Sequence, residues 1–451
     1  MVAWHKAVFA AVAVLAFGGV ASGRAQAAGA DDLGKSLTPF GAIAAGNADG
    51  TIPAWDGGIT RRPPGTSRAQ PLANPYAGEQ KLFSITAANV AKYEGKLSAG
   101  TAARLRSVAG YRIDVYPSHR NFAAPQEILD AAIANAHRAH LINGGLGVQG
   151  AELSIPFPVP ENGEQAMWNH LLRWRGRQVE RVNVHAIVGT NGNYTLARTS
   201  EKIMFPYNMP GPNPDGLNNL FFVEALAPPR IAGTMNINKD YLDPFTTPRQ
   251  SWIYSPGERR VRRTPKVSYD TPIPETDGLQ TVDDYDLFNG PLDRYSWKLL
   301  GRREIYIPYN CYELQNPKRR YAEIIGKDFV NPDALRWELH RVWVVEANLL
   351  PGMTHIYAKR VVYLDEDSWQ IVISDRWDRR GILWRTATTF PVLDYDVPVL
   401  GADGAEYVDL IARRYIVGGL HGQEVEQPSF DRHKLTEADF APDVLRREGM
   451  R

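Results

Sequence analysis

The stretch that decides the fold covers residues 338–375 and reads ELHRVWVVEANLLPGMTHIYAKRVVYLDEDSWQIVISD. It contains three runs rich in β-branched and aromatic residues, which favour strands. The runs are residues 338–347, 355–364 and 369–375. Short polar or Pro-Gly turns at 351–352 and 365–367 separate them. Successive strands joined by such turns predict an antiparallel meander.

Both faces of these predicted strands carry apolar residues. In the first run Trp343 and Val345 share one face, while Val342 and Val344 share the other. A sheet that is apolar on both sides must be covered on both sides. One side can take the N-terminal helices, and the other can form a cradle for an apolar ligand. The alternative is that both sides are ordinary core, with loops over the second.

More strands extend the meander in both directions along the chain. The alternation in residues 182–188, followed by the turn signal Asn191-Gly192, predicts a hairpin with residues 194–198. The remaining predicted strands are residues 250–254, 259–263, 302–309, 382–388 and 406–416. Together they predict one large, curved antiparallel β-sheet.

The N-terminal third has a different pattern. Residues 33–76 are rich in Gly and Pro but keep apolar anchors such as Phe40 and Trp55, which predicts an ordered N-terminal wrap over another surface. Apolar residues at helical spacing predict four helices, at residues 86–93, 98–108, 127–137 and 163–172. The predicted class is therefore α+β. Residues 28–180 form the wrap and helical region, and residues 181–451 form the sheet region, in one continuous domain.

The first 27 residues predict a secretory signal peptide. A basic start precedes a short apolar core, and Ala25-Gln26-Ala27 provides a cleavage site after Ala27. The core is too short to span a bilayer, and no later run of about 18 apolar residues is found. We therefore expect a periplasmic protein without a transmembrane segment. An uncleaved anchor is the alternative.

Composition excludes several classes of function. The net charge is +1, and removal of Lys6 and Arg24 with the signal leaves −1, so no global basic field predicts nucleic-acid binding. Cys311 is the only cysteine, which excludes an internal disulfide. Four of the ten histidines, His119, His170, His340 and His355, are scattered and show no metal-ligand spacing. Asp283, Asp284 and Asp286 are expected as a solvated turn, with a metal site as the alternative, and residues 365–367 are expected as a hairpin tip. We assign no catalytic residue, no metal and no cofactor.

One basic group stands at the end of the helix predicted over residues 163–172. Arg173 and Arg175 follow Trp168-Asn169-His170, and such a group can bind a phosphate or carboxylate headgroup. A helix dipole also favours basic residues at its C-terminus without any ligand. The structural explanation is favoured at this point.

Several stretches together resemble one known family. They are residues 37–53 (LTPFGAIAAGNADGTIP), Pro156-Phe157-Pro158 with Met167-Trp168-Asn169-His170, residues 259–263 (RRVRR), and residues 341–347 (RVWVVEA) with 363–369 (YLDEDSW). The chain is identified as a member of the DUF1329 family of Gram-negative envelope proteins. The resemblance implies a half-barrel similar to the lipoprotein-sorting proteins LolA and LolB, and a role beside RND-type exporters. It supplies no catalytic residues.

These observations favour a periplasmic carrier or binding protein for lipid-like hydrophobic ligands. The predicted hydrophobic lining consists of Trp252, Tyr254, Trp297, Tyr306, Trp343, Tyr357 and Tyr363. Arg259, Arg260, Arg262 and Arg263 are the predicted docking surface for a headgroup or partner, unless they form only a solvated strand face. The first alternative is a non-catalytic adaptor subunit of an RND-type export or outer-membrane complex. The second is an unrecognised hydrolase.

Overall fold

The structure is a computed structural model that describes residues 29–64, 66, 72–264, 269–273 and 276–450. The predicted signal peptide, residues 1–27, lies outside the described residues. Within the described part, no helix combines the length and the apolar composition needed to cross a membrane.

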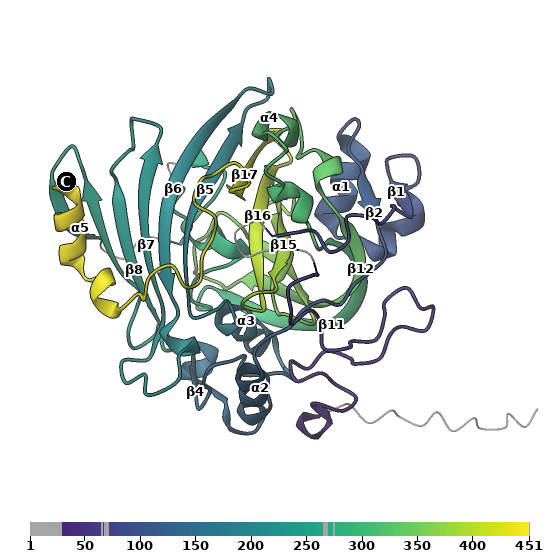
Figure 1. Ribbon diagram of the computed structural model, residues 1–451, viewed down its shortest axis with the longest axis horizontal. Helices are drawn as coiled ribbons and strands as arrows, with labels where there is room; N and C mark the ends of the chain where they lie inside the picture. The colour runs from purple at the N-terminus through teal and green to yellow at the C-terminus, as the bar shows by residue number, and fades with distance from the viewer. Residues whose placement is uncertain (1–28, 65, 67–71, 265–268, 274–275, 451) are drawn as a thin grey trace, which may run out of the picture.

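One sheet of 15 strands dominates the fold (Figure 1). Its order is β1-β2-β12-β13-β14-β15-β16-β17-β5-β6-β7-β8-β9-β10, and β11 also pairs with β12. The described pairings are antiparallel apart from β2 with β12, so the predicted antiparallel sheet is confirmed. The strands are β1 Phe83–Ile85, β2 Ile113–Val115, β5 Gln178–Val188, β6 Tyr194–Met204, β7 Leu217–Ala227, β8 Met235–Tyr241, β9 Gln250–Ser255, β10 Arg260–Thr264, β11 Tyr295–Pro308, β12 Trp337–Leu349, β13 Lys359–Asp365, β14 Ile371–Trp377, β15 Leu383–Asp394, β16 Val399–Asp409 and β17 Arg414–Leu420. A separate hairpin joins β3 His140–Ile142 and β4 Gly147–Gln149.

Helices lie around the sheet. They are α1 Ala99–Ser107, α2 Gln126–Arg138, α3 Gly163–Leu172, α4 Tyr321–Ile324 and α5 Pro442–Gly449. Figure 1 shows α1 near the β2 end of the sheet and α5 outside the β7–β8 end. The Ser98 side chain accepts a hydrogen bond from the Thr101 N–H and so caps α1 at the predicted residue.

The helix predicted over residues 86–93 is wrong. A 3₁₀ helix, Val90–Lys96, begins later instead. The Asn89 side chain accepts a hydrogen bond from the Thr86 N–H and donates one to the Ser84 carbonyl. These bonds hold residues 84–89 in a turn, because an Asn side chain competes with the helical backbone for the same groups.

Two strand predictions also need correction, and two long strands are missed. The strand expected over residues 355–364 begins only at Lys359, because the Tyr357 N–H donates to the His355 Nδ1 and not to a neighbouring strand. The strand expected over residues 406–416 is a hairpin of β16 and β17, with Arg413 in the left-handed region at φ 52°. Strands β7 and β8 are not predicted at all.

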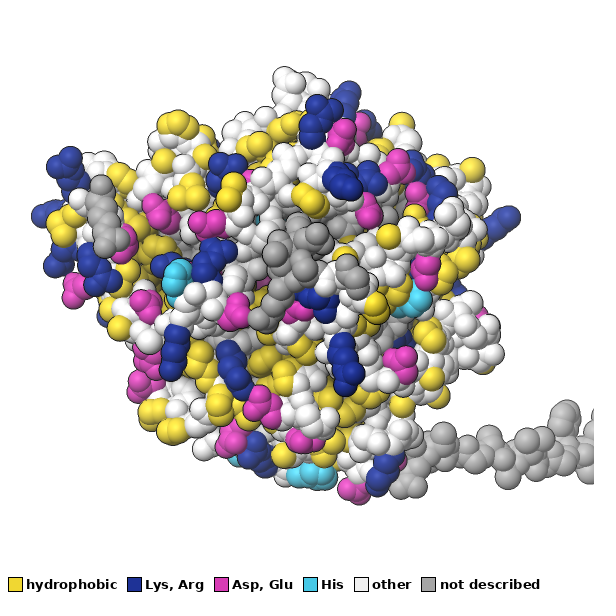
Figure 2. Space-filling view, viewed as in Figure 1, with side chains coloured by type: hydrophobic (Ala, Val, Ile, Leu, Met, Phe, Trp, Pro, Cys, Tyr) yellow, Lys and Arg dark blue, Asp and Glu magenta, His cyan; other side chains and the backbone are white. Residues whose placement is uncertain are grey.

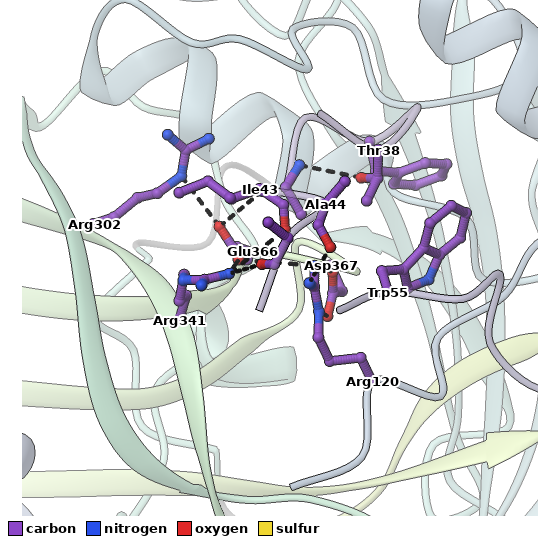
Figure 3. A network of polar contacts seen from close by, with 12 residues as sticks. Thr38, Ile43, Ala44, Trp55, Arg120, Arg302, Arg341, Glu366 and Asp367 are labelled. Atoms are coloured by element: carbon purple, nitrogen blue, oxygen red, sulfur yellow. Dashed lines mark hydrogen bonds and ion pairs between the residues drawn. The ribbon is translucent and has the colours of Figure 1, made fainter. Parts of the chain in front are cut away.

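Residues 41–45 of the predicted N-terminal wrap lie against the turn between β13 and β14. Three arginines converge on that turn, Arg120 on Asp367 and Arg302 and Arg341 on Glu366 (Figure 3). The same guanidinium groups donate to wrap carbonyls, those of Ala44, Gly41 and Ala45. A segment without long helices or strands thus satisfies part of its backbone through side chains of two strands and of the loop before α2.

The acidic run expected as a solvated turn and the hairpin tip at residues 365–367 are both buried. Asp283 and Asp284 are 2% and 0% exposed, and they pair with Arg360 and Arg376 of β13 and β14. Asp365, Glu366 and Asp367 do connect two strands, but they are at most 2% exposed. Burial of carboxylates requires paired charges and hydrogen bonds, and these arginines provide both.

The two halves of the sheet are covered differently. Nearly every residue of β12 to β15 is buried, so both faces of these strands lie inside the protein. In β6 to β9, residues of one face pack under a C-terminal segment. This segment contains a 3₁₀ helix that ends at Phe440 and the helix α5, which contributes Leu445. We call this the outer face and the opposite side the inner face. The inner face is only partly covered.

Gly41 provides a test of how closely the wrap approaches the rest of the chain. It has φ 83°, and a Cβ there would lie 1.8 Å from the Pro158 carbonyl oxygen. We expect Gly41→Ala to lower the free energy of unfolding by at least roughly 2 kcal/mol more than Gly50→Ala lowers it. Gly50 has a similar φ, 72°, but open space around it. Urea unfolding of both variants measures the difference, and equal losses would contradict the close approach.

Glu366 provides a test of the buried acidic turn. Burial and the neighbouring Asp367 raise the pKa of the Glu366 carboxyl to about 7, from 4.5. The folded protein therefore binds this proton more tightly, and stability falls as the pH rises from about 4.5 through 7. We expect Glu366→Gln to reduce the loss of stability between pH 5 and pH 8 in urea unfolding. Glu346→Gln is the control, since the pKa of Glu346 is lowered, chiefly by its hydrogen bond with Asn348. An unchanged loss in Glu366→Gln would contradict the prediction.

Candidate functional site

A cavity of about 1100 Å³ lies against the inner face of β5 to β9. This is at or above the upper end of the range typical of small-molecule sites, roughly 300–1,000 Å³. Residues from β16 and β17 and from the segment around residues 269–294 enclose it from the other sides. Its wall therefore combines segments from both parts of the sheet region.

The strand register explains which side chains reach the cavity. Arg181, Glu201, Val223, Asn236 and Ile253 lie side by side across β5 to β9, and all five line it. The next inner row does the same. It consists of Val179, Ile203, Phe221, Asn238 and Ser251. Successive residues of a strand face opposite sides, so the residues between these rows belong to the outer face.

The cavity has an apolar part and a rim with exposed hydrophobic side chains. Val179, Ile203 and Phe205 form a buried cluster, against which Phe221 and Phe430 pack. At the rim Phe245, Met353 and Ile253 are 64%, 44% and 37% exposed. Exposed apolar side chains around an opening are typical of a place where apolar ligands or partners enter.

Charged groups lie together at the α3 side of the cavity. Arg173 donates to Asp286 at 2.6 Å, and Arg181 donates to Glu201 at 2.8 Å and to the Tyr285 hydroxyl at 2.8 Å. Burial acts to raise the pKa of Asp286, but Arg173 holds it well below its usual range. The site therefore keeps ionised groups in contact with an apolar cavity.

The seven aromatic residues predicted as a lining are placed elsewhere. All seven lie outside the set of residues that line the cavity. Trp297, Tyr306, Trp343, Tyr357 and Tyr363 are 0–7% exposed within the main core. Their rings and polar atoms meet other core groups: the Trp343 ring, for example, stacks on that of Trp369 at 5.9 Å, and the Tyr357 hydroxyl donates to Asp284. We therefore take the cavity, and not these side chains, as the candidate site.

Trp252 and Tyr254 miss the cavity by one residue of register. Their neighbours Ser251 and Ile253 on β9 line it, whereas Trp252 and Tyr254 pack on the outer face. The Tyr254 hydroxyl donates to the Gly449 carbonyl at the end of α5. Alternation identifies two faces but not which of them the C-terminal helix will cover.

The four predicted docking arginines lie on the hairpin of β9 and β10. Arg259, Arg260, Arg262 and Arg263 are all exposed, and β10 is an end strand of the sheet order. Arg262 pairs with Glu258 at 2.9 Å, and the Arg263 guanidinium lies 5.8 Å from the centre of the Trp252 ring. Figure 2 shows Lys and Arg side chains gathered at the edge of the molecule where α5 lies.

One group of potential metal ligands comes together that sequence spacing keeps apart. His340, Asp365 and Asp367 each have one potential ligand atom, a ring nitrogen or a carboxylate oxygen, and these three atoms lie within 4.8 Å of one another. Arg120 already donates to both oxygens of Asp367, and the Asp365 Oδ2 accepts from Ser368. These bonds occupy both oxygens of Asp367 and one oxygen of Asp365, and they leave the buried Asp365 Oδ1 without a hydrogen-bond partner among the described residues. We assign no metal to this group.

Sequence reasoning misses the part of the cavity wall that β7 and β8 form, because it does not predict these two strands. The alternation of Phe221, Val223 and Ala225 with Leu220 and Phe222 was a usable signal for β7. Both faces of that strand are largely apolar, however, so the signal does not tell which face meets the cavity. The asparagines of β8 resemble a loop in composition, although Asn236 and Asn238 occupy inner-face positions.

Comparison with known proteins identifies the family. The model for the family described as protein of unknown function (DUF1329) matches residues 84–446. An uncharacterised protein of Pseudomonas aeruginosa is 44% identical over 423 residues, which cover 93% of each chain. This chain belongs to the DUF1329 family, as its resemblance predicts.

Solved structures similar to this chain include three envelope-related or family proteins. A putative outer membrane lipoprotein-sorting protein domain from Vibrio parahaemolyticus has a TM-score of 0.41 and 16% identity, covering 60% of this chain and 92% of that one. A DUF1329 family protein from Desulfovibrio piger has a TM-score of 0.41 and 14% identity with the same coverage. A LolA superfamily protein from Nitrosomonas europaea has a TM-score of 0.38 and 12% identity, covering 63% and 100%.

Proposed function

We propose that this DUF1329 protein is a non-catalytic binding or carrier protein for lipid-like ligands outside the cytoplasm. The observation that carries the proposal is the cavity of about 1100 Å³ on the inner face of β5 to β9. A cavity of this size that combines an apolar cluster with a few polar groups is typical of a small-molecule binding site.

The apolar part of the cavity supplies the driving force for binding. Transfer of a methylene group from water into such a cluster contributes roughly 0.8 kcal/mol. The buried Val179, Ile203 and Phe205 and the adjoining Phe221 give an acyl chain such surroundings. Exposed Phe245 and Met353 at the rim mark the route by which the chain would enter.

The predicted signal peptide supports a periplasmic location for this binding function. A lipid-like molecule that crosses this aqueous space needs its apolar surface covered, and a cavity with an apolar wall can cover it. The relative in Pseudomonas aeruginosa spans nearly the whole chain, so the proposal extends to a protein of similar length.

The basic hairpin supports a role in docking. Arg259, Arg260, Arg262 and Arg263 are exposed on the hairpin whose Ile253 and Thr264 line the cavity. An anionic membrane surface or an acidic face of an envelope transporter would be attracted to this charge, and delivery at the cavity opening would follow. The adaptor alternative uses the same hairpin without any ligand.

Blocking the cavity tests the proposal. Val223→Trp places a large side chain on the inner face of β7, where Val223 lines the cavity. We expect the mature wild-type protein to take up one or more lipid molecules in native mass spectrometry, and Val223→Trp to lose at least about tenfold in occupancy, because the added indole fills space that the ligand needs.

Leu226→Trp is the matched control. Leu226 lies three residues along the same strand, is 40% exposed and is not a lining residue. It should bind lipid as the wild type does. If the wild type takes up no lipid from periplasmic extract or from added phospholipid, the carrier proposal fails, and cross-linking through the Arg259–Arg263 hairpin then tests the adaptor alternative.

A further inference from the structure

Arg175 is the cation of the cavity whose charge the protein leaves incompletely matched. It follows α3 and lines the cavity, with a side chain 20% exposed. Its Nε is buried and has no hydrogen-bond partner. Its Nη2 donates to the Leu171 carbonyl at 3.0 Å, and its Nη1 lies 3.6 Å from Asp286, beyond hydrogen-bond distance.

The carboxylates near Arg175 are occupied by other arginines. Asp286 accepts from Arg173 at 2.6 Å through Oδ2 and from Gln370 at 3.1 Å through Oδ1. Asp240 accepts from Arg249 through both oxygens, at 2.5 and 3.0 Å.

Arg181 has its own partners on the next strand. It pairs with Glu201, and Asp403 adds to the negative field around it. At this end of the cavity three guanidinium groups, those of Arg173, Arg175 and Arg181, thus share the carboxylates of Asp286 and Glu201, and Arg175 has only the long contact.

The surroundings of Arg175 make this mismatch costly. Its guanidinium stacks over the Phe205 ring, 4.5 Å from the centre, and Phe205 belongs to the buried apolar cluster. Burial and the like charge of Arg173 lower the pKa of Arg175 to about 10. A partly desolvated cation gains most from an anion that brings its own hydrogen-bond acceptors.

We propose that the cavity binds an anionic, long-chain amphiphile whose carboxylate or phosphate oxygens accept hydrogen bonds from the Nη1 of Arg175, while its acyl chain lies against Val179, Ile203, Phe205, Phe221 and Phe430. This inference rests on the proposed binding function and names the class of ligand. The head group of such a ligand gives Arg175 the partner that the described residues of the protein do not provide, and its acyl chain lies on the apolar cluster next to Arg175.

The contrast with the neighbouring arginines supports this assignment. The Nε of Arg173 is also buried without a partner in the described part of the chain, but its Nη atoms donate to a carbonyl, an amide and a carboxylate within the protein. Arg181 donates to a carboxylate and a hydroxyl. These contacts hold α3, the 286 region and β6 together. A helix-dipole role for Arg175 accounts for the Leu171 contact alone, and it leaves the Nη1 and the cavity position without a purpose.

The experiment compares ligands that differ only in the head group. Oleate, oleyl phosphate and oleyl alcohol are titrated into the mature protein below their aggregation concentrations, and binding is followed by calorimetry. We expect wild-type protein to bind the two anions at least about tenfold more tightly than the alcohol, because charge-assisted hydrogen bonds add to the same chain burial. The carboxylate and phosphate arms identify which acid group the site prefers.

Arg175→Gln removes the charge, and Arg177→Gln is the matched control. Arg177 is exposed two residues further on, pairs with Glu127 and is not a lining residue. We expect Arg175→Gln to weaken oleate or oleyl phosphate roughly 10- to 100-fold with no change for oleyl alcohol. Arg177→Gln should match the wild type for all three ligands. Arg175→Lys should keep part of the preference for anions.

Thermal unfolding guards against a folding defect. Without ligand, Arg175→Gln should unfold at or above the wild-type temperature, since it removes an incompletely matched buried charge, and it should lose the stabilisation by oleate. Equal binding of oleate and oleyl alcohol by the wild type overturns the inference but leaves the carrier function in place. An equal loss of oleate binding in Arg175→Gln and Arg177→Gln also overturns the inference and leaves the carrier function in place. Failure of all three ligands to bind overturns the proposed function itself.

Discussion

The need to cover a sheet on both faces is the constraint on which this structure depends. Strands β12 to β15 are apolar on both sides, and the N-terminal wrap, the helices and the segment around residues 281–287 bury both. The C-terminal segment covers only one side of β6 to β9. The opposite, inner face is the wall of the cavity, so the site lies on the part of the sheet that no other described segment packs against closely.

Buried ion pairs make this coverage specific. Apolar contacts alone would let an irregular wrap settle in many ways, because they have no direction. The arginines that contact the turn between β13 and β14 donate to carbonyl groups of the N-terminal wrap and pair with carboxylates of the turn. Arg360 of β13 and Arg376 of β14 pair with Asp283 and Asp284. Each charge would be costly if left alone, so only the arrangement that pairs them all is favourable. The same rule applies to Arg175, whose charge is incompletely paired within the protein and is therefore available to an anionic ligand.

The position of the candidate site could not be predicted. The strands over residues 338–364, apolar on both faces, are expected either to form a ligand cradle or to be core on both sides. They are core on both sides, and the cavity lies on the inner face of β5 to β9 instead. The individual residues could not be predicted, because aromatic side chains such as Trp343 and Tyr357 are equally suited to a core. Whether such a ring meets a ligand or another ring depends on which distant segment packs over it. For Trp252 and Tyr254 that segment is α5, more than 180 residues later in the chain.

The sequence by itself determined the antiparallel meander, the bounds of α3, the capped start of α1 and membership of the DUF1329 family. These follow from local periodicity, turn chemistry and short motifs, which act between residues near in sequence. The tertiary structure alone decided that β17 pairs with β5, at Tyr415 and Val188, and so joins the two parts of the sheet. It also decided which face of β5 to β9 stays open and that Arg175 lies among charges already paired. The physical reason is that alternation assigns residues to faces, whereas burial of a face depends on segments far away in the chain.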